Sequence, residues 1–259
     1  MWYTRSGLQL GIARYTFAGQ YVKDKKVLEI ACENGYGASY LLSKGAQEVT
    51  GGDISEQAIQ YAKEHYKADG LNFLRLDAQQ LLFADESFDV IVAFEVIEHL
   101  EDYNKFLIEC KRVLKRDGIF ICSTPNRLVE SGNRNRPWFP GHTKEFLIEE
   151  FHNLIAAHFD NIAIYGICAG AKPPGLMNRI IYGPKPSMLK PFMPIGVKLM
   201  NFFTAFTFRS NHLISLEKID EKKLDKLVEP KYQPFLIQDD TLSPLDIMIV
   251  SRKNTDKIR

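Results

Sequence analysis

The chain has 259 residues, of which 45% are hydrophobic and 25% are charged. This composition is typical of a globular protein that is long enough to bury a full core. Its 33 Lys and Arg residues nearly balance its 32 Asp and Glu residues, for a net charge of +1. That balance argues against a protein whose main task is to coat nucleic acid.

The four cysteines lie far apart and form no C-x-x-C pair: Cys32, Cys110, Cys122 and Cys168. This spacing argues against a zinc ribbon, an iron–sulfur centre and a disulfide scaffold, and it fits a reducing compartment. Residues 1–20 lack the basic stretch, apolar run and cleavage site of a signal peptide. No window of about 18 apolar residues is free of charge or proline. We therefore expect a cytoplasmic protein without a spanning helix.

Apolar runs alternate with helix-compatible stretches in the first half of the chain. The predicted strands cover residues 27–31, 48–52, 72–76, 88–94 and 119–123. The predicted helices cover residues 38–43, residues 58–66 behind the N-cap candidate Ser55, and residues 106–114. The run at 88–94 is almost continuously apolar, as expected of a strand buried on both faces. This alternation predicts right-handed βαβ units, a parallel sheet and an α/β fold.

The second half of the chain follows a different pattern. The predicted elements here are a helix over 143–154, a sixth strand over 159–167 and a last strand over 244–250. A stretch as long as 168–243 is improbable as a structureless loop, so we expect a folded insertion that serves as a cap or substrate region. The main domain would then comprise residues 1–167 together with residues 244–259.

A glycine-containing turn follows the first predicted strand, which suits a nucleotide-like ligand because a missing Cβ lets the backbone approach closely. The turn departs from the dinucleotide pattern G-x-G-x-x-G, since Ala31 and Glu33 occupy its first two glycine positions. Glu33 would repel a pyrophosphate at the following helix N-terminus. A ligand without phosphates therefore fits better than NAD.

Two acidic residues end successive predicted strands. The Asp53 carboxylate can accept hydrogen bonds from both hydroxyls of a ribose, and the Asp77 carboxylate can accept a hydrogen bond from an adenine amino group. The alternative is that both carboxylates merely cap helices, a common role for Asp.

Residues 27–37 resemble motif I of the class I S-adenosylmethionine-dependent methyltransferases. Asp53, the pair Asp77-Ala78, and residues 94–99 and 114–118 are similar to the later motifs of that family in order and spacing. The resemblance implies a Rossmann-like seven-stranded sheet of order 3-2-1-4-5-7-6, with strand 7 antiparallel and the insertion between strands 6 and 7. It also implies S-adenosyl-L-methionine as the cofactor.

The resemblance implies a set of residues around the cofactor: Glu29, Ala31, Gly35, Asp53, Ile54, Asp77, Ala78 and Phe94. The first three would line its methionine end, the two aspartates would take the ribose and the adenine, and Phe94 would offer its backbone to the amino group. Arg14 lies in a segment similar to the cofactor-covering N-terminal helix of methyltransferases from bacterial polysaccharide clusters. It would pair with the cofactor's carboxylate; the alternative is a solvated surface arginine.

Methyl transfer to an oxygen acceptor needs a base, and two histidines qualify. His99 follows the fourth strand at the edge where α/β proteins bind ligands. His142 lies in a segment similar to one that carries a substrate-facing histidine in related small-molecule methyltransferases. The alternatives are that His142 only bonds the backbone of a helix-start turn and that His99 only fixes its loop.

Glu95, Glu98 and His99 form the order E-x-x-E-H, which resembles a divalent-cation site of ubiquinone-pathway O-methyltransferases and small-RNA 2′-O-methyltransferases. Many methyltransferases with this string bind no metal, so the predicted site includes none.

Residues 161–216 contain no Asp or Glu, and basic residues alternate there with phenylalanines. The segment is either a cap with its own small core or a surface for a large anionic, partly apolar ligand. We expect some of the basic residues Lys172, Arg179, Lys185 and Lys190 to face the mouth of the pocket. We also expect a helix over 195–208 and peripheral membrane contact through 172–209.

We expect O-methylation of a saccharide or another small hydroxylated acceptor, phosphate-bearing or lipid-linked. The alternatives are a catalytically silent cofactor-binding module with a partner-docking insertion, and metal-assisted 2′-O-methylation of RNA. The neutral overall charge gives a nucleic-acid acceptor little support.

Overall fold

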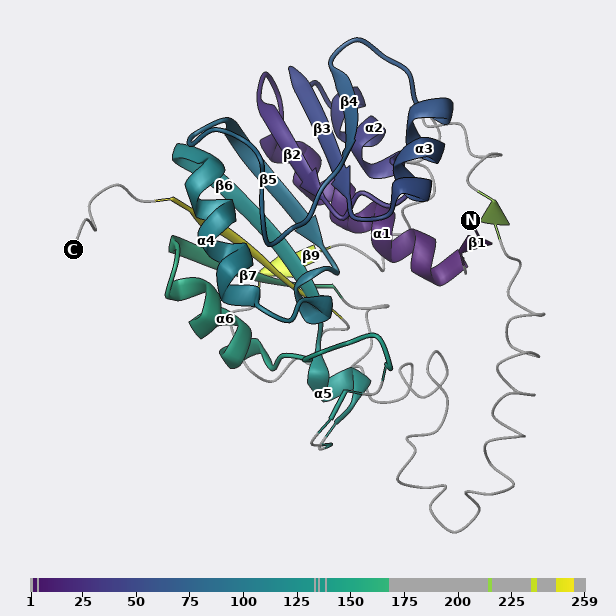
Figure 1. Cartoon of the computed structure of the whole chain (residues 1–259). Coiled ribbons are helices and arrows are strands. Elements are labelled where there is room, and N and C mark those ends of the chain that lie inside the picture. Colours follow the sequence, from purple (N-terminus) through teal and green to yellow (C-terminus); the bar gives the residue numbers. More distant parts are fainter. Residues whose placement is uncertain are drawn as a thin grey trace.

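The computed structural model describes residues 2–3, 5–132, 134, 136–137, 139–167, 214–215, 234–236 and 246–253. Its main feature is a sheet of order β4-β3-β2-β5-β6-β10-β7-β9, drawn in Figure 1. The strands are β2 (Lys26–Ile30), β3 (Glu48–Asp53), β4 (Leu71–Arg75), β5 (Phe88–Phe94), β6 (Leu114–Pro125), β7 (Asp160–Ile167), β9 (Pro234–Leu236) and β10 (Asp246–Arg252). A separate two-stranded sheet pairs β1 (Trp2–Tyr3) with β8 (Ile214–Ser215).

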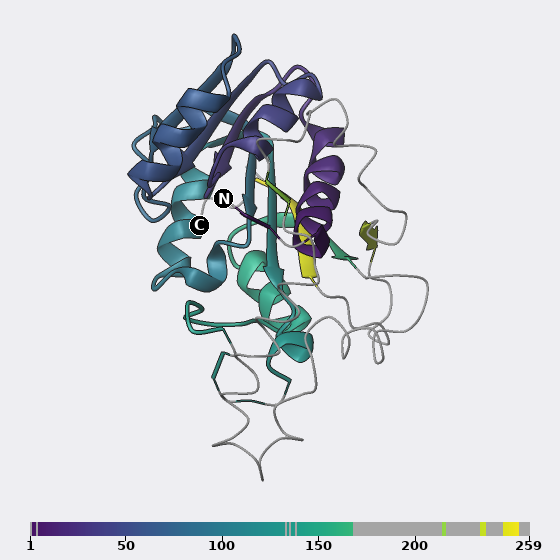
Figure 2. The ribbon, with the colours of Figure 1, turned by 90° about the vertical axis from the view of Figure 1, so that its right-hand side faces the viewer.

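Helices cover both faces of the large sheet. They are α1 (Arg5–Ala18), α2 (Tyr36–Ser43), α3 (Glu56–His65), α4 (Tyr103–Val113), α5 (Arg127–Glu130) and α6 (Ile148–Ala156), with short 3-10 turns η1 (Gly19–Tyr21) and η2 (Ile97–His99). Apolar side chains of α1, α2 and α3 share one core cluster, whereas those of α4 and α6 share another. Figure 2 shows α1 and α4 on opposite sides of the sheet.

The two core clusters explain the nearly continuous apolar run of β5. Val90 and Val92 pack in the cluster with α1, whereas Ile91 and Ala93 pack in the cluster with α4. Alternate residues of a strand point to opposite faces, so a strand covered on both faces is apolar throughout.

The predicted α/β fold and sheet order are confirmed. Strands β2, β3, β4, β5 and β6 pair in parallel, and β10 lies between β6 and β7 and is antiparallel to both. The predicted N-cap is also present, since the Ser55 side chain accepts a hydrogen bond from the Ala58 amide. The small strand β9 adds an edge to the sheet, antiparallel to β7. It comes from the segment 168–243 that the sequence set apart as an insertion.

The helix predicted over 143–154 begins later, at Ile148. The residues before it are held in other contacts: Thr143 bonds to the backbone of Glu98, and Phe146 forms a bridge with Asn126. The carbonyl of Phe146 accepts from the amide of Arg127 and not from an amide four residues later, as it would in a helix.

The helix predicted over 195–208 and the basic residues Lys172, Arg179, Lys185 and Lys190 lie outside the described residues, so the expectations for the insertion stay predictions. None of the helices in the described part of the chain is long and apolar enough to cross a membrane.

Candidate functional site

The carboxyl ends of the parallel strands β2 to β6 lie at one edge of the sheet, and the predicted site residues other than Arg14 and His142 lie near these ends. Glu29 of β2 is 1% exposed and accepts a hydrogen bond at Oε1 from the hydroxyl of Tyr15. Its Oε2 atom has no hydrogen-bond partner among the described residues. Burial raises the pKa of Glu29 to about 8, whereas the Tyr15 bond acts in the opposite direction. A buried acceptor of this kind suits a cationic ligand group.

The turn after β2 uses unusual backbone angles. The φ angles of Ala31, Glu33 and Gly35 are 60°, 47° and 87°. Left-handed angles are rare for residues with a Cβ, and at Gly35 a Cβ would lie only 2.7 Å from the Cβ of Ala62. Gly35 is therefore needed to let the turn pass close to α3 before α2 begins.

Both predicted aspartates make local backbone bonds. Asp53 accepts hydrogen bonds from the amides of Glu33, at 2.9 Å, and Ser55, at 2.8 Å. These bonds tie the end of β3 to the turn after β2, and a carboxylate has lone pairs left for ligand hydroxyls. Asp77 accepts from the amide of Gln79 at 2.8 Å.

The remaining predicted cofactor residues end or follow neighbouring strands of the sheet. Ile54 is 65% exposed, and Ala78 is half-buried. Phe94 ends β5 and packs edge-on against Tyr15, with ring centroids 5.2 Å apart. Contact of these residues with a cofactor stays a prediction.

Arg14 lies between two carboxylates. One of its terminal nitrogens is 2.6 Å from Asp246 and 3.1 Å from Glu95, and its side chain is only 12% exposed. The alternative of a solvated surface arginine is therefore wrong. Pairing with a cofactor carboxylate stays a prediction, and in this structure the guanidinium joins α1 to β10 and to the residue after β5.

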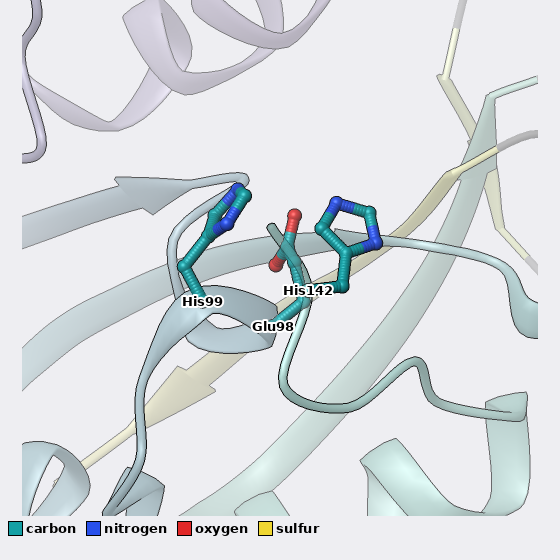
Figure 3. A group of neighbouring side chains, drawn as sticks. All are labelled: Glu98, His99 and His142. Atoms are coloured by element: carbon teal, nitrogen blue, oxygen red, sulfur yellow. The ribbon is translucent and has the colours of Figure 1, made fainter. Parts of the chain in front are cut away.

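The two predicted catalytic histidines lie together, with ring centroids 4.8 Å apart. Glu98 joins them, and donor atoms of Glu98, His99 and His142 all lie within 4.8 Å of one another. Figure 3 shows the Glu98 carboxylate between the two rings. Glu98 is buried and accepts a hydrogen bond from Thr124 at Oε2, but its Oε1 has no partner within the described part of the chain. Burial raises the pKa of Glu98.

Each histidine uses its Nδ1 atom in a local contact. His99 Nδ1 lies 2.9 Å from the carbonyl oxygen of Gly141, and His142 Nδ1 lies 3.0 Å from Oε1 of Glu145. Burial lowers the pKa of His142, although the bond to Glu145 acts in the opposite direction. A neutral imidazole can accept a proton or bind a metal.

Residues 28–122 match the family described as "Methyltransferase domain". A Mycobacterium tuberculosis protein named "Probable S-adenosylmethionine-dependent methyltransferase" is 37% identical over 149 residues, which cover 57% of this chain and 53% of that protein. Among solved structures, a SAM-dependent methyltransferase from Thermotoga maritima superposes with a TM-score of 0.58 at 15% identity, covering 95% of this chain and 91% of that one. Residues 28–122 are therefore a methyltransferase domain, similar in sequence and in fold to S-adenosylmethionine-dependent methyltransferases.

The cofactor of this methyltransferase domain is S-adenosyl-L-methionine, as the motifs predicted. The phthiotriol/phenolphthiotriol dimycocerosates methyltransferase of Mycobacterium tuberculosis is 40% identical over 97 residues, or 37% of this chain and 36% of that protein. This chain spans about half the length of the first curated relatives it matches, or less.

The methyltransferase fold brings in two side chains that the sequence did not single out. Glu145 contacts His142, and the Phe139 ring lies 4.9 Å from the His142 ring between centroids. The three-residue spacing of His142 and Glu145 was a usable signal. The helix predicted over 143–154 obscures this signal, because it separates Glu145 from the loop that carries His142.

The group formed by Glu98, His99 and His142 fits a divalent cation by its chemistry. One carboxylate and two imidazoles suit ions such as Mn²⁺ or Zn²⁺, and the buried Oε1 of Glu98 lacks a partner among the described residues. Glu95 of the E-x-x-E-H order is engaged elsewhere, because it accepts a hydrogen bond from Ser123 and contacts Arg14.

Proposed function

We propose that this protein transfers the methyl group of S-adenosyl-L-methionine to a hydroxyl oxygen of a saccharide or another small hydroxylated acceptor. The observation that carries the proposal is the group of His99, His142 and Glu98 at the sheet edge where the cofactor turn lies. The acceptor oxygen would attack the methyl carbon as the carbon–sulfur bond breaks, and the hydroxyl proton would pass to a base. S-adenosylhomocysteine and the methyl ether are the products.

His142 suits the role of that base. Its side chain is 9% exposed, and its Nδ1 atom is held by Glu145, so its position is constrained. Holding acceptor and base in one geometry supplies much of the rate in such a displacement. His99 lies beside it and can bind the acceptor hydroxyl.

A second way to activate the acceptor is favoured by the unpartnered Oε1 atom of Glu98. Glu98, His99 and His142 would hold a divalent cation there. When bound, such an ion lowers the pKa of a hydroxyl that reaches it. Dialysis against a chelator followed by Mn²⁺ titration separates this version from base catalysis without metal.

The acid-free residues 161–216 favour an acceptor that carries phosphate or a lipid, since basic and aromatic side chains alternate there. The name of the phthiotriol dimycocerosates methyltransferase also indicates a lipid acceptor for that relative. The insertion would bind this part of the acceptor, with peripheral membrane contact through 172–209 and a cytoplasmic location.

Incubation with methyl-labelled cofactor and a set of glycans, nucleotide sugars and polyprenyl-linked sugars tests the proposal. We expect label in one of these classes, and a loss of about 10²-fold or more with His142→Asn. His152→Asn on α6 is the matched control and should leave transfer unchanged. Cofactor binding without transfer to any acceptor would support a silent module instead, and labelled RNA would support the nucleic-acid alternative.

A further inference from the structure

The segment that carries His142 is fixed to the loop after β5. The amide of Thr143 donates to the carbonyl of Glu98 at 2.7 Å, and the Thr143 hydroxyl contacts the carbonyl of Leu100, also at 2.7 Å. The amide of His142 donates to the carbonyl of Phe139 at 3.1 Å. These bonds hold the backbone of His142 against Glu98, although 44 positions separate the two residues in the chain.

Glu145 holds the ring of His142 from behind. It is 2% exposed, and its two oxygens accept from two different donors: Oε1 from His142 Nδ1 and Oε2 from the hydroxyl of Ser131. The next residue, Phe146, is fully buried, and its carbonyl accepts from the amide of Arg127. Packing and these two hydrogen bonds therefore hold the Glu145 side chain in place.

These contacts favour one tautomer of His142. An ionised carboxylate only accepts hydrogen bonds, so the nitrogen facing Glu145 must be the donor. The neutral ring then has its proton on Nδ1 and a lone pair on Nε2. In Figure 3 the ring nitrogen farther from the attachment point lies on the side of Glu98, whereas the nearer one points away.

His99 is held in the same manner by a different acceptor. Its Nδ1 atom faces the carbonyl oxygen of Gly141, and a carbonyl also only accepts. The Nε2 atom of His99 therefore also carries a lone pair in the neutral ring. Two independent acceptors impose the same tautomer on the two adjacent rings.

We infer that Glu145, supported by Ser131, is a positioning residue that locks His142 in the Nδ1-protonated tautomer, so that Nε2 presents its lone pair to the acceptor site. This inference rests on the proposed function, because a lone pair there is what either version of acceptor activation requires. Nε2 takes the hydroxyl proton if His142 is the base, and it is a ligand atom if a cation binds. With the proton on Nε2, neither role is available to that atom.

The tautomer can be read directly in the protein without acceptor or metal. Long-range ¹H–¹⁵N correlation spectra distinguish a protonated from an unprotonated ring nitrogen, and the signals of His142 are assigned by their loss in His142→Asn. We expect a protonated Nδ1 and an unprotonated Nε2 in the neutral ring. A protonated Nε2 overturns the inference, whatever the enzyme assays show.

Glu145→Gln tests the cause. An amide can donate to Nδ1, so it permits the other tautomer, and we expect the two forms to mix in the spectra. With an acceptor identified, kcat should fall about 10- to 100-fold, as for outer partners of working histidines, while the dissociation constant of the cofactor changes less than about twofold. Glu149→Gln, the same change at an exposed site in the first turn of α6, is the matched control and should alter neither quantity.

An unchanged tautomer and an unchanged kcat in Glu145→Gln would overturn the role of Glu145. If this variant does not fold, Ser131→Ala weakens the same chain of bonds from its outer end, and the spectra of the unmodified protein still test the tautomer. The predicted tautomer without methyl transfer to any acceptor would leave the inference standing and contradict the proposed function.

Discussion

The carboxyl group of Glu29 is buried at the end of β2, and its ionisation is coupled to folding. Its pKa rises from an ordinary value of 4.5 to about 8, mainly because burial disfavours the charged form. The folded state therefore holds this proton more tightly than the unfolded state does. The contribution to stability is present at low pH and is lost as the pH rises through about 8.

Glu29→Gln removes that titration and keeps the shape of the side chain. We expect the free energy of unfolding of the unmodified protein to fall more between about pH 6 and about pH 9 than that of the variant, measured by urea denaturation without cofactor. Parallel pH dependences of the two proteins would contradict the raised pKa. Glu101→Gln, the same change at an exposed site away from this turn, is the control and should follow the unmodified protein.

At the scale of elements, the junction between β2 and α2 depends on one glycine. Gly35 has a φ of +87°, and a Cβ there would lie 2.7 Å from Ala62 and 2.8 Å from the Phe73 ring. Gly45, after α2, has a similar φ of +92°, but a Cβ there would meet only Lys23, at 3.7 Å. An added side chain would therefore strain the backbone at both positions, but it would be crowded by its neighbours only at Gly35.

We expect Gly45→Ala to cost about 1–2 kcal/mol of stability from the left-handed backbone alone. Gly35→Ala should cost about 1–3 kcal/mol more, because the added methyl group also overpacks α3 and β4. Because the turn is tied to Asp53, cofactor affinity should fall with Gly35→Ala and stay unchanged with Gly45→Ala. Thermal denaturation and calorimetric titration measure the two effects, and equal costs at the two sites would contradict the crowding argument.

At the scale of the whole molecule, Arg14 joins the N-terminal helix to the last strand. Its partners are Asp246 of β10 and Glu95 after β5, and all three side chains are largely buried. Burial raises the pKa of Glu95 to about 7, while Arg14 acts in the opposite direction. Removing the cation would leave two neighbouring carboxyl groups without their main partner.

Arg14→Met should therefore destabilise the protein by about 3–5 kcal/mol, the usual cost of breaking a buried ion pair. Lys26→Met removes one end of the exposed pair with Glu48 and should cost no more than about 1 kcal/mol. Chemical denaturation at neutral pH measures both. If Asp246→Asn with Arg14→Met costs as much as the sum of the single changes, the two residues are not coupled and the pair does not join α1 to β10.

The sequence determined the fold class, the order of the strands and the cofactor of the methyltransferase domain. Periodicity and apolar runs report burial directly, so β5 could be identified from its residues alone. Motifs near strand ends share one edge in any parallel sheet, which is why His99 and Asp53 could be placed at one edge before their contacts were known. The N-cap hydrogen bond of Ser55 at the start of α3 joins residues close in the chain, so it could also be predicted from the sequence.

Only the tertiary structure decided the contacts between distant segments. Arg14 meets Asp246, Ser131 meets Glu145, and Glu98 joins His142 because packing brings their backbones together, and no local pattern encodes those distances. The late start of α6 has the same origin, since the carbonyl of Phe146 accepts from Arg127 of another segment. Periodicity reports which face of an element is buried, but the partner across that face is chosen by the fold as a whole.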